Sequence, residues 1–232
     1  MSKLITFADR AALMQAAAEC IAQAAKDAIA TRGQACVALS GGSTPEPAYR
    51  VLAAMPLDWQ RITFALIDER FVPPTDDASN QKLVERALAP AFAQGAAFKP
   101  MYAGAPTAAQ AAERAELIYA PLQVDLAVMG MGEDGHTASW FPRAGSLEAA
   151  LDPNSQRSVA AIWAPQAAGA ADRLTLTWAG YTRAARGLLL ITGEAKRAVL
   201  EQATQGGASP VALPVSALFR PGAPPIKVLW AP

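Results

Sequence analysis

The chain has 232 residues, 52% of them hydrophobic, and its 20 Lys and Arg residues balance its 20 Asp and Glu residues. This length fits a single domain over residues 1–232, with a core that needs no disulfide or metal support. Zero net charge is not typical of nucleic-acid binders, and no stretch reaches the roughly 20 apolar residues of a membrane span. Because no targeting peptide is recognisable either, we expect a cytoplasmic protein with neither kind of partner.

The first predicted elements are a long helix and a buried strand. Asp9 is a suitable N-cap, apolar residues then recur at helical spacing, and Gly33 is placed to end the helix. Residues 35–39 form an apolar run of strand length, and a helix is expected from about Glu46.

The same alternation of strand and helix continues along the chain. Helices are expected from about Asn80 and from Thr107 to about Tyr119, with a long surface connection at 94–106. Further strands are predicted at 62–67, 126–129, 158–163, 174–177, 187–192 and 226–230. This order predicts an α/β fold of the Rossmann-like kind, with a mainly parallel sheet covered by helices on both faces. Ligands of such sheets bind beyond the carboxyl ends of the strands.

Ser40-Gly41-Gly42-Ser43-Thr44-Pro45 follows the strand at 35–39. Two glycines permit a tight turn and a close approach of a ligand to the backbone, and Pro45 suits the first turn of a helix. Free N–H groups at a helix start bind anions. The segment therefore predicts either a phosphate site or an ordinary strand-to-helix turn, and it lacks the Gly-Lys-Ser/Thr of a Walker A loop.

Asp68-Glu69-Arg70 ends the strand at 62–67. Its charges fit a surface cluster, or a site in which Arg70 meets an anionic substrate and an acid orients a neighbouring group.

Residues 130–139 contain G-x-G-x-x-G, but Glu133 and Asp134 occupy the variable positions and Pro142 follows closely. A dinucleotide fingerprint needs a helix opening within the glycines, so we interpret the segment as a loop that presents Asp134 and His136. His136 is the only histidine in the chain, and imidazole is the side chain best suited to proton transfer near neutral pH.

Arg173 and Lys196 lie beside predicted strands and, together with Arg70, could surround a phosphate. No metal site is expected, because one histidine excludes a His-rich centre. Cys20 and Cys36 have no metal-ligand spacing and are expected to be buried and inert.

Taken together, these segments resemble the 6-phosphogluconolactonase family along nearly the full chain. The shared series also includes Phe71-Val72-Pro73, Ser79-Asn80, Phe141-Pro142, Arg173-Leu174-Thr175-Leu176-Thr177 and Thr192-Gly193-Glu194-Ala195-Lys196. The resemblance implies a Rossmann-like fold shared with glucosamine-6-phosphate deaminases. It also implies hydrolysis of 6-phospho-D-glucono-1,5-lactone to 6-phosphogluconate in the oxidative pentose phosphate pathway, without a cofactor.

The resemblance also implies roles for individual residues. His136 would be the general base, with Asp68 and Asp134 as polar members of the catalytic site. Substrate and phosphate would be held by Ser40, Gly41, Gly42, Ser43, Arg70, Arg173 and Lys196. The expected partner is a small sugar phosphate, and the chain is expected to be a monomer or a small homo-oligomer.

Two other functions remain open at this stage. One is an isomerase of the glucosamine-6-phosphate deaminase kind, although the deaminases carry a glutamate at the place that Phe141 occupies here. The other is a sugar-phosphate-binding protein without catalytic activity.

Overall fold

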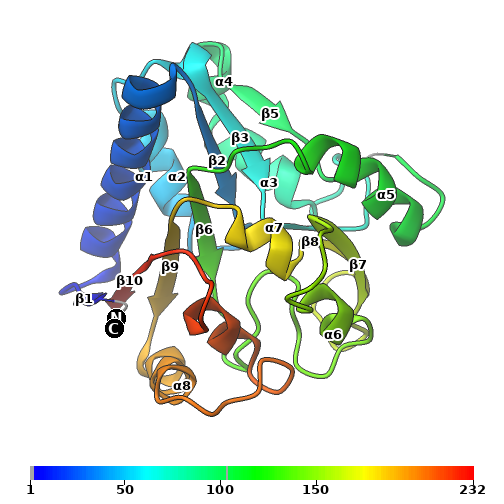
Figure 1. Cartoon of the computed structure of the whole chain (residues 1–232). Coiled ribbons are helices and arrows are strands. Elements are labelled where there is room, and N and C mark those ends of the chain that lie inside the picture. Colours follow the sequence, from blue (N-terminus) through cyan, green and yellow to red (C-terminus); the bar gives the residue numbers. More distant parts are fainter. Residues whose placement is uncertain (1–2, 103) are drawn as a thin grey trace.

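The protein folds around a seven-stranded sheet, with a smaller three-stranded sheet beside it (Figure 1). The structure is a computed structural model and describes residues 3–102 and 104–232; residues 1, 2 and 103 lie outside the described residues. The order in the large sheet is β1-β10-β9-β6-β2-β3-β5, and every pair of neighbours is parallel. The small sheet has the order β4-β8-β7 and is antiparallel.

The large sheet consists of β1 (Lys3–Thr6), β2 (Ala35–Leu39), β3 (Ile62–Leu66), β5 (Ala97–Lys99), β6 (Leu126–Gly130), β9 (Gly187–Thr192) and β10 (Ile226–Ala231). The small sheet consists of β4 (Asp68–Arg70), β7 (Val159–Trp163) and β8 (Asp172–Leu176). The helices are α1 (Arg10–Arg32), α2 (Glu46–Ala53), α3 (Asn80–Ala87), α4 (Ala89–Ala93), α5 (Ala108–Tyr119), α6 (Leu147–Ala150), α7 (Trp178–Thr182) and α8 (Glu194–Thr204), with short 3-10 helices η1 (Trp59–Arg61) and η2 (Pro214–Phe219).

Local sequence signals set the helix ends. Asp9 accepts a hydrogen bond from the N–H of Ala12 at the start of α1, and Gly33 ends that helix with a φ of 79°. Ser79 and Thr107 cap α3 and α5 in the same way as Asp9. These ends agree with the sequence predictions. The strand order and parallel pairing of the large sheet confirm the α/β fold expected from the sequence.

The small sheet and β5 differ from the sequence predictions. The strands predicted at 158–163 and 174–177 exist, but they pair with each other and with β4 rather than in the large sheet. The predicted surface connection at 94–106 includes β5, which pairs with β3 at the sheet edge; residue 103 of this stretch lies outside the described residues. Strand pairing depends on contacts that are distant in sequence, so local patterning does not reveal it.

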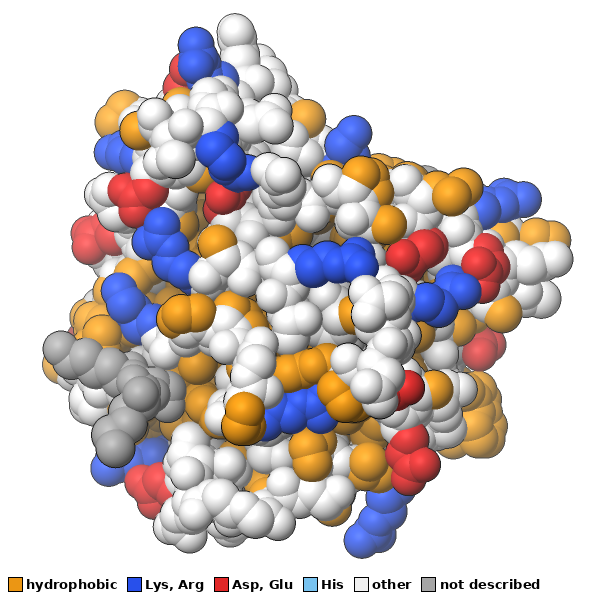
Figure 2. Space-filling model, viewed as in Figure 1, with side chains coloured by type: hydrophobic (Ala, Val, Ile, Leu, Met, Phe, Trp, Pro, Cys, Tyr) orange, Lys and Arg blue, Asp and Glu red, His pale blue; other side chains and the backbone are white. Residues whose placement is uncertain are grey.

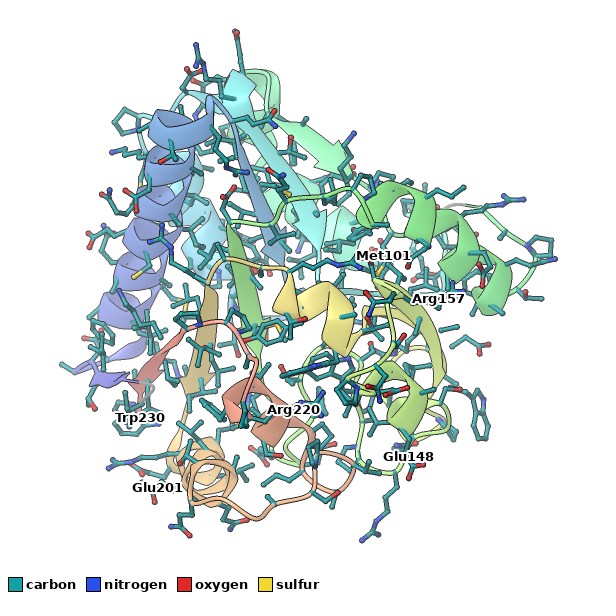
Figure 3. All side chains as sticks on the ribbon, viewed as in Figure 1. Met101, Glu148, Arg157, Glu201, Arg220 and Trp230 are labelled. Atoms are coloured by element: carbon teal, nitrogen blue, oxygen red, sulfur yellow. The ribbon has the colours of Figure 1, made fainter. Side chains whose placement is uncertain are left out.

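The buried side chains form one large apolar core and one small cluster. The small cluster contains Phe141, Ala150, Ile162 and Ala164 and packs around β7 and α6. At the end of η2, the guanidinium of Arg220 stacks over Trp178 at 3.5 Å and donates to the carbonyl of Leu151 (Figure 3). Within the described residues, no helix combines the length and apolarity needed to cross a membrane.

Candidate active site

The strands β9, β6, β2 and β3 are consecutive neighbours in the large sheet, and the polar segments follow their carboxyl ends. Leu39 pairs with both Leu66 and Val128, so the ends of β2, β3 and β6 are level. The strand order also reverses between β6 and β2, which makes this edge the topological switch point where α/β sheets bind ligands. The register therefore brings the predicted site segments together.

In the segment after β2, the first residue, Ser40, is held by hydrogen bonds, and two glycines form the turn that follows. The Ser40 hydroxyl donates to the carbonyl of Val128 at 2.8 Å, and the Ser40 carbonyl accepts from the hydroxyl of Tyr49 at 2.7 Å. A Cβ on Gly41 would lie 1.8 Å from Oδ1 of Asn80, so only glycine fits there. Gly42 has a φ of 100°, which also favours glycine. Ser40 thus anchors the loop, while Gly41 lets it pass close to Asn80.

Residues 68–70 alternate across β4, as side chains of a strand do. Asp68 and Arg70 line the pocket, whereas Glu69 is fully buried and accepts hydrogen bonds from the backbone N–H groups of Asn80 and Gln81 at the start of α3. Burial raises the pKa of Glu69, although those donors partly offset it. Glu69 therefore supports the helix, and Asp68 and Arg70 belong to the site.

Two further polar side chains fix Asp68 and Arg70. The hydroxyl of the fully buried Ser139 donates to Oδ2 of Asp68 at 2.6 Å. Nη1 of Arg70 donates to Oδ1 of Asn80 at 2.5 Å and to the carbonyl of Ala78 at 2.8 Å. Asn80 and Ser139 were not among the site residues predicted from the sequence. Two features of the sequence could have identified them. Asn80 directly follows Ser79, the N-cap of α3, and Ser139 lies three residues after His136.

The loop after β6 presents His136 next to Asp134. Nδ1 of His136 lies 2.6 Å from Oδ1 of Asp134, and the same oxygen accepts from the His136 backbone N–H at 3.1 Å. Partial burial raises the pKa of Asp134, but the hydrogen bonds and charge of His136 outweigh burial and lower that pKa overall. A Cβ on Gly132 would lie 2.2 Å from Nδ1, so the tight loop requires glycine there.

Arg70 and Arg173 are direct partners in the antiparallel pair β4 and β8. Like charges directly opposite each other across strands are unfavourable, so this pair favours an anion between or beside them. Arg173 is buried and fixed by donation from Nε to the carbonyl of Ala170 at 2.8 Å and from Nη2 to that of Ala168. Burial lowers the pKa of Arg173, and the charge of Arg70 lowers it further while Asp68 opposes this change.

One pocket of about 240 Å³ collects nine of the ten predicted site residues. They are Ser40, Gly41, Gly42, Ser43, Asp68, Arg70, His136, Arg173 and Lys196. Asp134 does not line this pocket and contacts it only through His136. Lys196, from the first turn of α8, has no hydrogen bond or ion pair to the rest of the described chain. The pocket therefore combines three cations with Asp68 and with His136, whose Nδ1 is paired with Asp134 outside the pocket.

No three His, Cys, Asp or Glu side chains within residues 3–102 and 104–232 are grouped so that they could hold a metal ion. Cys36 is buried and its pKa is raised to about 12, chiefly by burial. Cys20 is only half-buried, so the expectation that both thiols are buried is wrong for Cys20.

A parallel α/β sheet with a cationic pocket and a histidine at its switch point is suited to enzymes that act on small phosphorylated metabolites. Comparisons with known proteins narrow this class. A sequence profile described as glucosamine-6-phosphate isomerases/6-phosphogluconolactonase matches residues 8–230. The chain therefore belongs to this family of sugar-phosphate enzymes, which confirms the resemblance seen in the sequence.

The individual relatives described here are named 6-phosphogluconolactonases. A 6-phosphogluconolactonase of Rhizobium meliloti is 42% identical and covers 97% of this chain and 97% of its own. One from Caulobacter vibrioides is 38% identical, over 99% of this chain and 97% of its own. The crystal structure of a 6-phosphogluconolactonase from Shewanella baltica has a TM-score of 0.93 at 32% identity, covering 100% of this chain and 98% of that chain.

Proposed function

We propose that this chain hydrolyses 6-phospho-D-glucono-1,5-lactone to 6-phosphogluconate in the pentose phosphate pathway, with His136 as the general base. The activity is that of the full-length relatives at 38–42% identity. The observation that carries the role of His136 is its position in the same pocket as Arg70, Arg173 and Lys196, with Asp134 on its Nδ1.

The three cations, Arg70, Arg173 and Lys196, bind the phosphate of the substrate. A guanidinium offers a planar fork to phosphate oxygens, and an ammonium acts as a point charge. Arg173 is held rigidly by two carbonyls, while Lys196 lies on a helix and is half-buried. The N–H groups of Gly41 and Gly42, in the loop between β2 and α2, add donors for an anion. Binding at these groups positions the lactone ring without taking part in the reaction.

The chemical step needs a base with a free ring nitrogen. Asp134 accepts a hydrogen bond from Nδ1–H of His136, which leaves Nε2 to accept the proton of a water molecule. The oxygen of that water forms a bond to the lactone carbonyl carbon. Collapse of the tetrahedral intermediate breaks the bond between this carbon and the ring oxygen, which takes the proton back from the imidazolium. The products are the free carboxylic acid and a hydroxyl group.

The negative charge on the carbonyl oxygen of the intermediate needs donors that are already in place. Arg70 is one such donor, because the two hydrogen bonds that Nη1 donates to Asn80 and Ala78 hold the guanidinium in place and leave Nη2 to donate. The backbone N–H groups of the Gly41-Gly42 loop are another. Both line the pocket, and the proposal holds with either.

Replacing His136 by alanine tests the proposal directly. We expect His136→Ala to lower kcat about 10²–10⁴-fold, the usual contribution of a general base. Hydrolysis is followed by acid release, corrected for spontaneous opening of the lactone. Near-normal turnover in a folded His136→Ala protein would remove the base role.

The deaminase and sensor alternatives predict different outcomes from the same protein. A deaminase would release ammonia from glucosamine 6-phosphate, and a sensor would be stabilised by sugar phosphates without turnover. The site has an aromatic ring, Phe141, where the resemblance places the deaminases' glutamate. We expect lactone hydrolysis and no ammonia release.

The finer statements about location and partners are also part of this proposal. We propose a cytoplasmic enzyme, either a monomer or a small homo-oligomer, with no nucleic-acid partner. Acidic and basic side chains are interspersed on the face shown in Figure 2, rather than gathered into a basic stripe. Nucleic-acid binders usually gather their basic side chains into a stripe, so this mixed distribution fits a small-molecule substrate better than a nucleic acid.

A further inference from the structure

Phe141 contacts two side chains of the candidate site, the proposed base His136 and the cation Arg173. Its ring is stacked on the imidazole of His136, with 4.3 Å between the centroids and 26° between the planes. The guanidinium carbon of Arg173 lies 5.2 Å from the centre of the same ring. Phe141 does not line the pocket, so it has no direct route to the substrate.

The ring of Phe141 is itself held from the side of the small sheet. Only 5% of Phe141 is exposed, and its packing partners are Ala150, Ile162 and Ala164 of the small cluster. The turn that carries it is closed by a hydrogen bond from the Phe141 N–H to the carbonyl of Ser139 at 3.2 Å. The large core does not include Phe141, so its ring position depends on this cluster and this turn.

The imidazole of His136 has few other constraints. One edge is fixed by Asp134 at Nδ1, and the backbone of Gly132 passes close to the same edge. The His136 side chain is 32% exposed, so part of the ring faces solvent. A hydrogen bond at one edge does not by itself fix the plane of a ring, because the ring can tilt about that edge. A stacked aromatic ring opposes such a tilt.

We infer that Phe141 is a positioning residue, whose ring fixes the plane of the His136 imidazole and thereby the direction of Nε2 toward the substrate. This inference rests on the proposed base role of His136. A base must lie within hydrogen-bond reach of the proton it takes, and small misplacements of reacting groups cost up to about 10²-fold in rate. If Phe141 only filled the small cluster, its loss would lower stability without affecting the imidazole.

The experiment compares Phe141→Leu with Phe141→Tyr, which keeps the ring, and with Ile162→Val as a matched control. Ile162 is 1% exposed in the same cluster and lies outside the proposed machinery. Because His136 is the only histidine, its two carbon-bound ring protons give the only histidine signals in a proton NMR spectrum. Stacking on Phe141 shields them, so they should appear upfield of the positions seen in the unfolded chain.

In Phe141→Leu we expect the upfield displacement to disappear and kcat to fall about tenfold, with KM within about twofold of the parent value. Phe141→Tyr should restore both, and Ile162→Val should change neither, even if it lowers the melting temperature. Equal losses in Phe141→Leu and Ile162→Val, or an unchanged kcat despite a lost displacement, would overturn the inference. The NMR displacement does not depend on turnover, so it separates failure of the stack from failure of the base role tested with His136→Ala.

Discussion

His136 and Asp134 form a hydrogen-bonded pair in which each residue has a distinct part. Asp134 is about half exposed, with 48% of its side chain accessible, so its effect on stability is screened by solvent. Its effect on the histidine is geometric, since the short contact to Nδ1 selects which ring nitrogen carries the proton. The pair therefore matters more for the protonation pattern of the proposed base, His136, than for folding.

The lowered pKa of Asp134 predicts a pH-dependent stability difference. A carboxyl group with a lower pKa in the folded state stabilises the fold above its ordinary pKa of 3.8, and this contribution is lost as pH falls through the folded-state value. We expect Asp134→Asn to be slightly less stable than the parent at pH 7, and the difference to be smaller at pH 3, below the ordinary pKa of the carboxyl group. Denaturant unfolding at both pH values measures this. The exposed neighbour Glu133 provides the control Glu133→Gln, and an equal gap at both pH values would contradict the assignment.

Lys196 and Arg197 are adjacent cations with different surroundings. Arg197 is paired with Glu201 and stacks over Trp230, whereas Lys196 lines the pocket. We expect Lys196→Ala to raise KM for the lactone about tenfold or more with a smaller change in kcat, because a phosphate contact remote from the reaction contributes mainly to binding. Steady-state kinetics measure the two constants. Arg197→Ala is the matched control, and a larger KM increase there would show that the wrong cation was assigned.

At the scale of elements, the start of α3 depends on a buried acid from β4. The carboxylate of Glu69 accepts from the N–H groups of Arg70, Asn80 and Gln81 at 2.7–2.8 Å and from the Ser79 hydroxyl at 3.0 Å. It thereby joins the short strand that carries Asp68 and Arg70 to the helix that carries Asn80.

Replacing Glu69 by glutamine tests this link. The amide NH₂ of Glu69→Gln would face donors, leaving buried N–H groups without an acceptor, so we expect a loss of about 1–3 kcal/mol in the free energy of unfolding. Denaturant unfolding at pH 7 measures it. Glu85, exposed on the same helix, gives the control Glu85→Gln, which should stay within about 0.5 kcal/mol of the parent. A comparable loss of unfolding free energy in that control would show that the link does not depend on Glu69.

The sequence predicted most elements and the location of the site, but not every pairing. Strand-end positions and residue types were enough to single out His136, Arg70 and Lys196, because a parallel sheet places such ends along one edge. The sequence of residues 174–177 predicts a strand, but it does not indicate whether that strand joins the large sheet or a second one. The pairing of Arg70 with Arg173 and the stack of Phe141 on His136 both depend on that second sheet, so neither could be foreseen.

At the scale of the whole molecule, the pocket is assembled from segments spread from Ser40 to Lys196. Segments after β2, β6 and β9 of the large sheet contribute to it, and Asp68, Arg70 and Arg173 come from β4 and β8 of the small one. A ligand that fills this pocket would contact residues from both sheets. The single domain expected over residues 1–232 stays a prediction, and ligand binding offers a way to test it.

We expect one cooperative thermal transition that shifts upward as a whole with 6-phosphogluconate, the product of the proposed reaction. A ligand at 100 times its dissociation constant stabilises the fold by about 2.7 kcal/mol. Calorimetry measures the shift and compares the calorimetric with the van't Hoff enthalpy. Lys196→Ala should reduce the shift at equal ligand concentration. Two separate transitions, of which only one moved, would show that the sheets unfold as independent units.

The edge strand β1 has one neighbour in the large sheet, β10, and the two run parallel with Lys3 beside Lys227 (Figure 1). During synthesis, β1 therefore leaves the ribosome long before its partner exists. Its backbone groups must stay bound to water, or to a chaperone, until residues 226–231 have emerged. The sheet edge is then a late event in folding, and a ribosome stalled before β10 would hold a nascent chain with both β1 and β9 exposed to other chains.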